Sequence, residues 1–347
     1  MRKIKIVGVI FFLLSLVLGL IYFIKQPSYS IKTEGVLYIV NKLSKSVTIF
    51  DLQMGTQIKE LPFEIEPHEA TTLSNPNRVV VTNYGSPEVG GNSITVIDAN
   101  TNSINENISL GESLRPHGII TFPKGNKVGV VTDTGNHLTV VDVNTGIVEK
   151  QISTKQDISH LLVHHPNKPL VYVANINSGS ISVIDLELDK VVEVIVCSKR
   201  AEGIAITPDG SEVWVTNIEE NFISVVNTDT NKITDRIATG KQPLRIKFSN
   251  DGKHCLVSNS SEGTISVYKT STKKQISKII IPGSKNLFEK IIYHTPRPVG
   301  ILMHPNGKYA FVSNFTAARV EVIDMTNFTI VSSIKSGKMP DGLALVN

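Results

Sequence analysis

Ten ionisable side chains occupy related positions in the sequence, most of them beside a segment that opens a β-rich stretch. They are His68, Glu69, Arg115, His117, His160, Arg200, Glu202, Arg245, Arg297 and Asp341. Guanidinium groups bind carboxylates or phosphates, and an imidazole beside a carboxylate can move protons. Three imidazoles together could bind a metal or a haem iron. The residue types therefore predict a site for a small anionic ligand, if the fold brings them together.

A sequence motif that recurs seven times indicates the strands that could bring these residues together. An apolar stretch ends in Asn or Asp at residues 41, 83, 133, 175, 217, 259 and 314, and a second, alternating stretch follows about ten residues later. Two more strand-like stretches, separated by turn signals such as Pro208-Asp-Gly210, complete each copy. Four short antiparallel strands per copy, repeated seven times, predict an all-β, seven-bladed β-propeller.

The two ends of the chain predict how the ring closes. The first copy begins at its second strand, residues 36–40, and lacks the opening strand of the others. The missing phrase stands at the C-terminus, as Pro340-Asp-Gly-Leu-Ala-Leu-Val346. We therefore expect the C-terminal strand to complete blade 1.

The repeat resembles that of the YVTN family of β-propellers over residues 34–347. The resemblance rests on Val213-Trp-Val-Thr-Asn217, on Val79-Val-Val-Thr-Asn83 and on the Ile-Ser-Val-Ile-Asp phrases downstream. The family implies a propeller fold and includes surface and binding propellers and relatives of haem d1 domains, so it is informative about fold and little about function. Two departures, Asp133 in place of Asn and Tyr268-Lys269 in place of Asp, fall on positions that we interpret as structural.

Extra residues accumulate in loops that a propeller places on one face. They lie in Ser86-Pro-Glu-Val-Gly-Gly91, before Pro116, and between Pro282 and Pro296. Because function tends to reside in elaborated loops, we expect this face and the adjoining channel mouth to bind the ligand.

Aligned opening strands give the ten candidates their places around this mouth. In an alignment of the copies, the position before the opening proline or its equivalent is occupied by Arg115, Arg200 and Arg297. The column two positions later contains His68, His117, Ser159, Glu202 and Asp341. Glu69, His160 and Arg245 occupy a third column, where other copies have glycine. His160 is thus offset by one residue from the other histidines. Since neighbouring residues of a strand face opposite sides, the sequence favours neither a metal nor a haem iron, and no Cys-x-x-Cys-His is present.

Composition excludes several classes of protein. The 35 basic and 31 acidic residues give a net charge of +4, and several of the basic residues flank the N-terminal apolar segment. The rest of the chain is close to neutral, so a nucleic-acid partner is not expected. Cys197 and Cys255 fall on different blades and are expected to be buried free thiols. We expect a monomer.

An apolar run from Ile6 to Ile24 follows three basic residues near the N-terminus. It is long enough to span a bilayer as a helix and has no small-residue cleavage site. We therefore predict a signal anchor at 1–25, a stalk at 26–33 and the propeller at 34–347, held outside the cytoplasmic membrane. Secretion after cleavage is the alternative.

Taken together, these observations favour a membrane-anchored propeller, without a cofactor, that binds a small anionic ligand or a protein of the cell envelope. The alternative is an enzyme that uses the channel mouth, such as a lyase or a lactonase-like hydrolase with Glu202 and His160 as an acid–base pair, or a redox-associated propeller.

Overall fold

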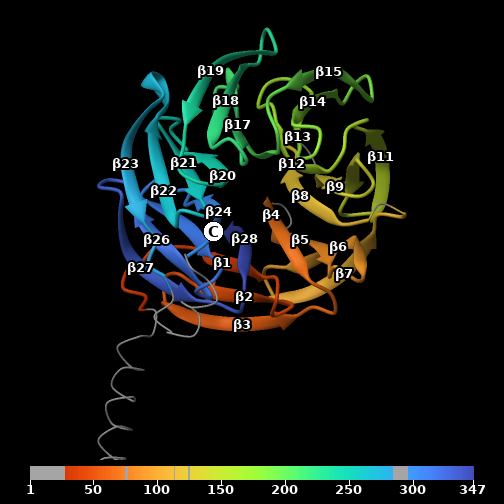
Figure 1. Ribbon diagram of the computed structural model, residues 1–347. Helices are drawn as coiled ribbons and strands as arrows, with labels where there is room; N and C mark the ends of the chain where they lie inside the picture. The colour runs from red at the N-terminus through yellow and green to blue at the C-terminus, as the bar shows by residue number, and fades with distance from the viewer. Residues whose placement is uncertain (1–27, 75–76, 113, 124–125, 284–295) are drawn as a thin grey trace, which may run out of the picture.

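The computed structural model describes residues 28–74, 77–112, 114–123, 126–283 and 296–347. Over these residues the protein forms seven four-stranded antiparallel sheets that stand as blades around a central axis (Figure 1). The predicted anchor and the first two residues of the predicted stalk lie outside the described residues. Among the residues described, there is no helix that could span a membrane.

The blades use the strands of each copy in chain order, from the axis outward, apart from blade 1. Blade 1 consists of β28 (Pro340–Val346), β1 (Val36–Asn41), β2 (Ser46–Asp51) and β3 (Thr56–Pro62). Blade 2 consists of β4 (Pro67–Ser74), β5 (Asn77–Gly85), β6 (Gly90–Asp98) and β7 (Ser103–Ser109). Blade 3 consists of β8 (Pro116–Thr121), β9 (Lys127–Thr132), β10 (His137–Asp142) and β11 (Ile147–Ser153). Blade 4 consists of β12 (Ser159–His164), β13 (Leu170–Asn175), β14 (Ser180–Asp185) and β15 (Lys190–Val196).

The remaining three blades follow the same plan. Blade 5 consists of β16 (Ala201–Ile206), β17 (Glu212–Asn217), β18 (Phe222–Asn227) and β19 (Lys232–Ala238). Blade 6 consists of β20 (Pro243–Phe248), β21 (His254–Asn259), β22 (Thr264–Lys269) and β23 (Lys274–Ile280), with a 3₁₀ turn at Thr270–Thr272. Blade 7 consists of β24 (Pro298–Met303), β25 (Tyr309–Asn314), β26 (Arg319–Asp324) and β27 (Thr329–Lys335).

The core lies between neighbouring blades, which explains the apolar runs of the repeat. A middle strand such as β17 is packed on both faces, and residues 213–217 are all buried. Trp214 of blade 5, for example, packs edge-on against Phe248 of blade 6, with ring centroids 5.1 Å apart. The outermost strands are mostly exposed or half-buried, with a buried residue next to the end of each strand, such as Ile237 of β19. Both cysteines are buried and free, as predicted.

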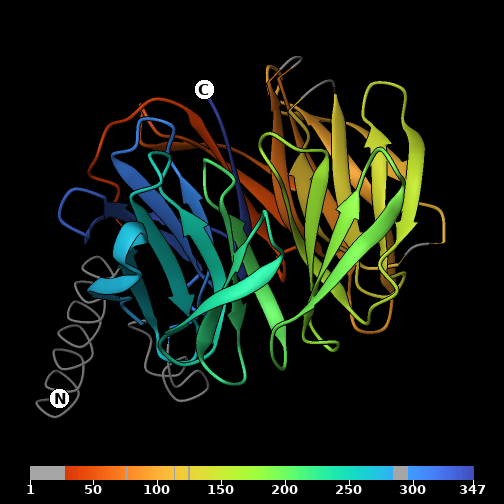
Figure 2. The ribbon, with the colours of Figure 1, turned by 90° about the horizontal axis from the view of Figure 1, so that it is seen from above.

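The ring closes as the sequence predicts. The C-terminal strand β28 pairs antiparallel with β1, with Val36 opposite Val346 and Ile39 opposite Leu343. Figure 1 shows β28 at the axis beside β1, and Figure 2, turned by 90°, shows the C-terminal end between the two halves of the ring. The described part of the predicted stalk lies against blades 1 and 7. There the backbone N–H of Ser30 donates to Ser332 Oγ at 2.8 Å, and Tyr29 stacks edge-on against Phe50.

Each innermost strand carries a β-bulge immediately after its first residue. Its first residue is opposite an Asn or Thr at or near the end of the next strand, as Pro67 is opposite Asn83 and Ser159 is opposite Asn175, and the register then shifts. The second residue of every inner strand falls in the shift and has no partner in the ladder. A bulge re-aims side chains, so two consecutive residues of one strand can face the axis here.

The third residue of the inner strands alternates between glycine and a larger side chain around the ring. In order from blade 1 to blade 7 the residues are Gly342, Glu69, Gly118, Leu161, Gly203, Arg245 and Gly300. The glycines allow the backbone of the next blade to approach closely. A Cβ on Gly118 would lie 2.7 Å from the carbonyl oxygen of His160, and one on Gly342 would lie 2.6 Å from that of His68. These contacts fix the inner strands that carry the candidate residues.

Candidate functional site

Seven of the ten candidate residues converge on the axis, at the end of the ring where the inner strands begin. We call this group the axial cluster: His68, Glu69, His117, His160, Glu202, Arg245 and Asp341. They come from six of the seven innermost strands, and their side chains are mostly buried, with His117 only 2% exposed. The predicted channel mouth is therefore closed by side chains packed against one another.

The structure corrects the sequence alignment of His160. Ser159 takes the place of the proline that opens β4 and β8, so His160 is the second residue of its strand, like His68 and His117. The three rings stack in order around the axis, with centroids 4.0 Å apart for the first pair and 3.5 Å for the second. The predicted offset of one residue, which argued against a shared ligand, is wrong because the serine was counted in the wrong column.

Arg245 bridges the cluster across the axis. Its guanidinium donates to Glu69 Oε1 at 2.8 Å and to Glu202 Oε1 at 3.4 Å, and lies 3.8 Å from Asp341 Oδ1. Burial opposes the charge on Arg245, but these three carboxylates more than offset it and raise the pKa of the guanidinium. One cation thus links blades 6, 2, 5 and 1.

Three further residues of the site were missed by sequence reasoning. Asp133 Oδ1 lies 3.0 Å from His160 Nδ1, and its other oxygen accepts a hydrogen bond from Tyr84 Oη at 2.9 Å. Lys42 Nζ lies 4.7 Å from the centre of the Tyr84 ring. The available signal was the replacement of the recurring Asn by Asp133, which we interpreted as structural. Here the copy that departs from the repeat supplies the partner of a histidine.

Burial perturbs the acid–base behaviour of the cluster. It lowers the pKa of His68 and that of His117 well below the usual value, assisted by the nearby cations Lys42 and Arg245. Both rings are therefore neutral at neutral pH. Burial also raises the pKa of Asp341 to about 7, although Arg245 acts in the opposite direction. Perturbed groups of this kind are concentrated at functional sites.

The remaining three candidates, Arg115, Arg200 and Arg297, lie at the rim. Arg115 donates to the carbonyl oxygen of Pro87 at 3.0 Å, within the predicted binding loop 86–91. Arg297 lies over the ring of Phe315, and Arg200 is exposed. Of the other enlarged loops, residues 284–295 lie outside the described part of the chain.

A central cavity of about 510 Å³ extends from the axial cluster along the inner strands. Glu69 and Arg245 form its polar end, and the exposed side chain of Lys247 also lines it. Most of the other lining residues are apolar or small, among them Leu161, Leu302 and Leu345. The cavity can therefore hold a small molecule with an apolar body and an acidic group.

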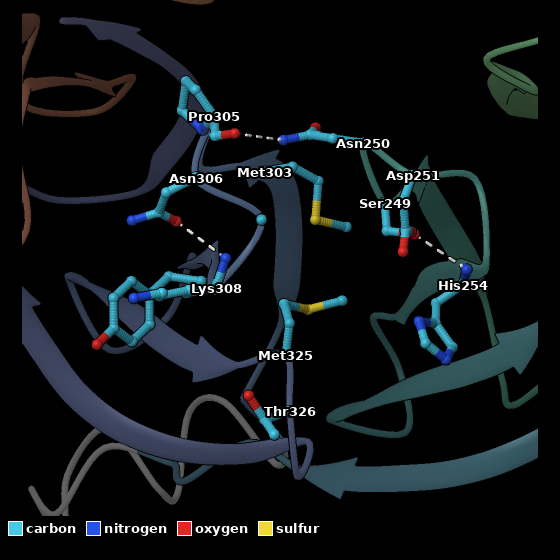
Figure 3. Close-up of a pocket in the computed structure, with 12 residues that line it drawn as sticks. Ser249, Asn250, Asp251, His254, Met303, Pro305, Asn306, Lys308, Met325 and Thr326 are labelled. Carbon is cyan, nitrogen blue, oxygen red and sulfur yellow. Dashed lines mark hydrogen bonds between the residues drawn. The ribbon is translucent and has the colours of Figure 1, made fainter.

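A second pocket, of about 540 Å³, lies on the opposite face between blades 6 and 7 (Figure 3). The turns after β20 and β24 form its sides, and Asn250 donates to the carbonyl oxygen of Pro305 across it at 3.3 Å. Met303 and Met325 point into it, whereas His254 stands at its edge (Figure 3). It contains none of the ten candidates, so the axial cluster with its cavity is the stronger candidate site.

Comparisons with known proteins agree with the fold and add a family. Residues 17–279 match the family model described as "Lactonase, 7-bladed beta-propeller". No curated protein matches the sequence significantly.

Solved structures show the same fold at low sequence identity. A chain of hydrazine synthase from Kuenenia stuttgartiensis aligns with a TM-score of 0.69 and 16% identity, covering 80% of this chain and 89% of that one. A functionally unknown protein from Desulfotomaculum acetoxidans aligns at 0.74 and 15%, covering 91% and 99%. The dihydro-haem d1 dehydrogenase NirN aligns at 0.63 and 14%, covering 89% of this chain and 65% of that one.

Proposed function

This chain belongs to the lactonase family of seven-bladed β-propellers, and on that premise we propose that it hydrolyses a small lactone bearing an acidic group. The observation that carries the proposal is the connected set Asp133, His160, Glu202 and Arg245. His160 Nε2 lies 3.8 Å from Glu202 Oε1, and Arg245, which lies 3.4 Å from the same oxygen, lines the cavity. An acid–base pair therefore lies beside a cation at the end of a cavity of suitable size.

The chemistry follows from these positions. The lactone occupies the cavity, with its acidic group near Lys247 and its carbonyl oxygen near Arg245. Glu202 takes a proton from water, whose oxygen bonds to the carbonyl carbon, and Arg245 stabilises the resulting oxyanion. The ring C–O bond then breaks, and the proton passes to the leaving alkoxide, giving a hydroxy acid. His160 acts as a positioning residue, held by Asp133 through its Nδ1.

Replacement of Glu202 by Gln tests the proposal because it keeps the side-chain shape and removes the base. We expect kcat for the best lactone of a panel to fall about 100-fold or more, which is the usual contribution of a general base, with a smaller change in KM. His160→Asn should lower kcat by a similar order. Release of acid in a weakly buffered indicator solution measures the rate.

The matched control is Glu187→Gln, an exposed glutamate in a blade 4 turn, which should leave kcat unchanged. Unchanged turnover in Glu202→Gln would refute Glu202 as the base.

A binding propeller without turnover is the second candidate. It is favoured by the close packing of the axial cluster, in which His117 is 2% exposed and Arg245 lies within 4 Å of three carboxylates. In this case a small anion or an envelope protein binds at the cavity or the loop face, as the sequence suggests. Ligands that raise the melting temperature and are recovered chemically unchanged would favour this candidate. The resemblance to YVTN-repeat propellers, supported by the recurring strand motif, is compatible with both candidates.

We also propose that the propeller is held outside the cytoplasmic membrane by residues 1–25. The proposal is supported by the basic N-terminus and the apolar run that follows it. The full chain, expressed in bacteria, should stay with the membranes after a carbonate wash, and protease added to spheroplasts should digest it. A chain starting at residue 28 should be recovered in the soluble fraction. Protection of the full chain from protease in intact spheroplasts would contradict the proposed orientation.

A further inference from the structure

We propose that His68, His117 and Glu69 form a binding site for a divalent metal ion of the zinc class, at the polar end of the central cavity. The proposal deepens the proposed function and rests on it for its catalytic meaning, because it concerns the same cluster. Metal binding itself can be measured without turnover.

The first argument is geometric. One ligand atom from each of the three residues lies within 4.8 Å of the other two. In a zinc site, bonds of about 2.0–2.2 Å place the ligand atoms roughly 3–3.6 Å apart, so a shift on the order of 1 Å closes the set around an ion. The bulge at the start of β4 makes the set possible, because it allows the consecutive residues His68 and Glu69 to face the axis together.

The second argument comes from unpaired nitrogen atoms. The Nδ1 atoms of His68 and His117 are buried and have no hydrogen-bond partner among the described residues. Leaving a buried polar atom unpaired is costly, and such atoms are rare in folded proteins. A metal ion bound between the two rings would give these nitrogens a partner.

The third argument concerns orientation. His68 Nε2 faces Asp341 Oδ2 at 3.6 Å, while its Nδ1 faces Glu69 Oε1 at 4.0 Å. Metal-binding histidines commonly direct their second nitrogen at a carboxylate, which fixes the ring and makes it a better ligand. Asp341 is placed to fulfil this role.

The fourth argument is charge. Four carboxylates (Glu69, Asp133, Glu202 and Asp341) surround the cluster, against the two cations Arg245 and Lys42. Asp341 is only partly ionised near pH 7, but the carboxylates still outnumber these two cations, which favours a bound cation. Two imidazoles and one carboxylate are also a ligand set of hydrolytic zinc sites, which keep a fourth position open for water or substrate. At the end of the cavity, the ion would polarise the lactone carbonyl.

The test is calorimetric titration of the chelator-treated full chain with Zn²⁺. We expect about one equivalent to bind, and Co²⁺ to give the visible absorption bands of a low-coordinate site. The double variant His68→Ala/His117→Ala should bind at least about 100-fold more weakly, because it loses two of three ligands and even a change at an outer partner costs about 10–100-fold in metal affinity. The control His164→Gln lies at the other end of β12 and should bind like the wild type.

The outcomes separate the two proposals. Absence of stoichiometric binding, or equal binding in the double variant, overturns the metal site. If the double variant does not fold, Glu69→Gln decides instead: it should weaken binding about tenfold or more and alter the Co²⁺ bands, and an unaltered spectrum overturns the site. Glu202→Gln should keep the metal while losing turnover. If the chelator-treated protein turns over lactone but binds no metal in the titration, only the metal site is refuted. If it binds metal but turns over no lactone, only the proposed hydrolase is refuted.

Discussion

Removal of residues 340–347 is expected to prevent the chain from folding into a stable monomer. These residues form β28, the innermost strand of blade 1, and Leu343 and Ala344 of this strand are buried. Without them β1 becomes an open edge, and the apolar side chains of Leu37 and Ile39 lose their cover. Exposed edges and apolar surface promote aggregation. Gel filtration should therefore show aggregate, and far-UV circular dichroism should show no cooperative melting.

A circular permutant provides the matched control. Because Val346 lies opposite Val36, a short turn with the sequence of residues 207–211 can join β28 directly to β1. The chain then begins with residues 337–347 and ends after β27. We expect this permutant to be monomeric and to melt close to the wild type, since every ladder is restored. A truncated chain that melted like the wild type would show that β28 is dispensable to the ring.

Replacement of Arg245 by Met is expected to cost about 3–5 kcal/mol of folding free energy, the usual cost of removing one partner from a buried ion pair. The change leaves Glu69, Glu202 and Asp341 buried without their shared cation. Urea denaturation measures the loss. Adding Glu69→Gln should recover part of it, because one uncompensated charge is removed.

The pH dependence distinguishes lost charge from lost packing in this variant. A carboxyl group whose pKa is raised on folding destabilises the fold above that pKa, and the penalty disappears as the pH falls toward the unfolded value. The pKa of Asp341 is about 7 even beside Arg245, and it should rise further without the cation. The deficit of Arg245→Met should therefore be largest near pH 8 and shrink toward about pH 5.

The exposed Arg200 provides the control for this experiment, because Arg200→Met should change stability by less than about 0.5 kcal/mol. A pH-independent deficit in Arg245→Met would indicate lost packing and contradict the electrostatic account.

The ring was predictable because its information is repeated in the sequence. Each copy has the same apolar runs and turn residues, so a strand that is hard to recognise in one copy can be placed by alignment with the other six. The closure was predictable for a related reason. The first copy lacks the opening strand that should precede Val36, and the C-terminus carries one extra opening strand from Pro340, so the two must pair. The predicted membrane anchor at residues 1–25 has no such redundancy in the sequence, and it lies outside the described residues.

The candidate site was predictable in membership but not in geometry. Seven of the ten residues meet because inner strands converge on the axis. The alignment nevertheless misplaced His160, because blade 4 opens with serine instead of proline. Strict alternation along a strand gives no reason for the consecutive residues His68 and Glu69 both to face the axis, which a bulge allows. Bulges depend on the pairing of two strands and leave little trace in one. Asp133 was visible as a departure from the repeat, but only the structure places it against His160.

The glycine column of the inner strands has a consequence that follows from parity. Four glycines and three larger residues cannot alternate perfectly around a ring of seven strands, so two of the glycines must lie on neighbouring strands. Here they are Gly300 and Gly342, on adjacent inner strands where the last blade meets the first. The defect in the pattern thus involves β28, the strand that closes the ring, and Gly300 lines the cavity. The seven-fold pseudosymmetry is broken at one fixed place, where β24, β28 and β4 approach one another through two successive glycines, and a larger side chain at either position would push neighbouring inner strands apart.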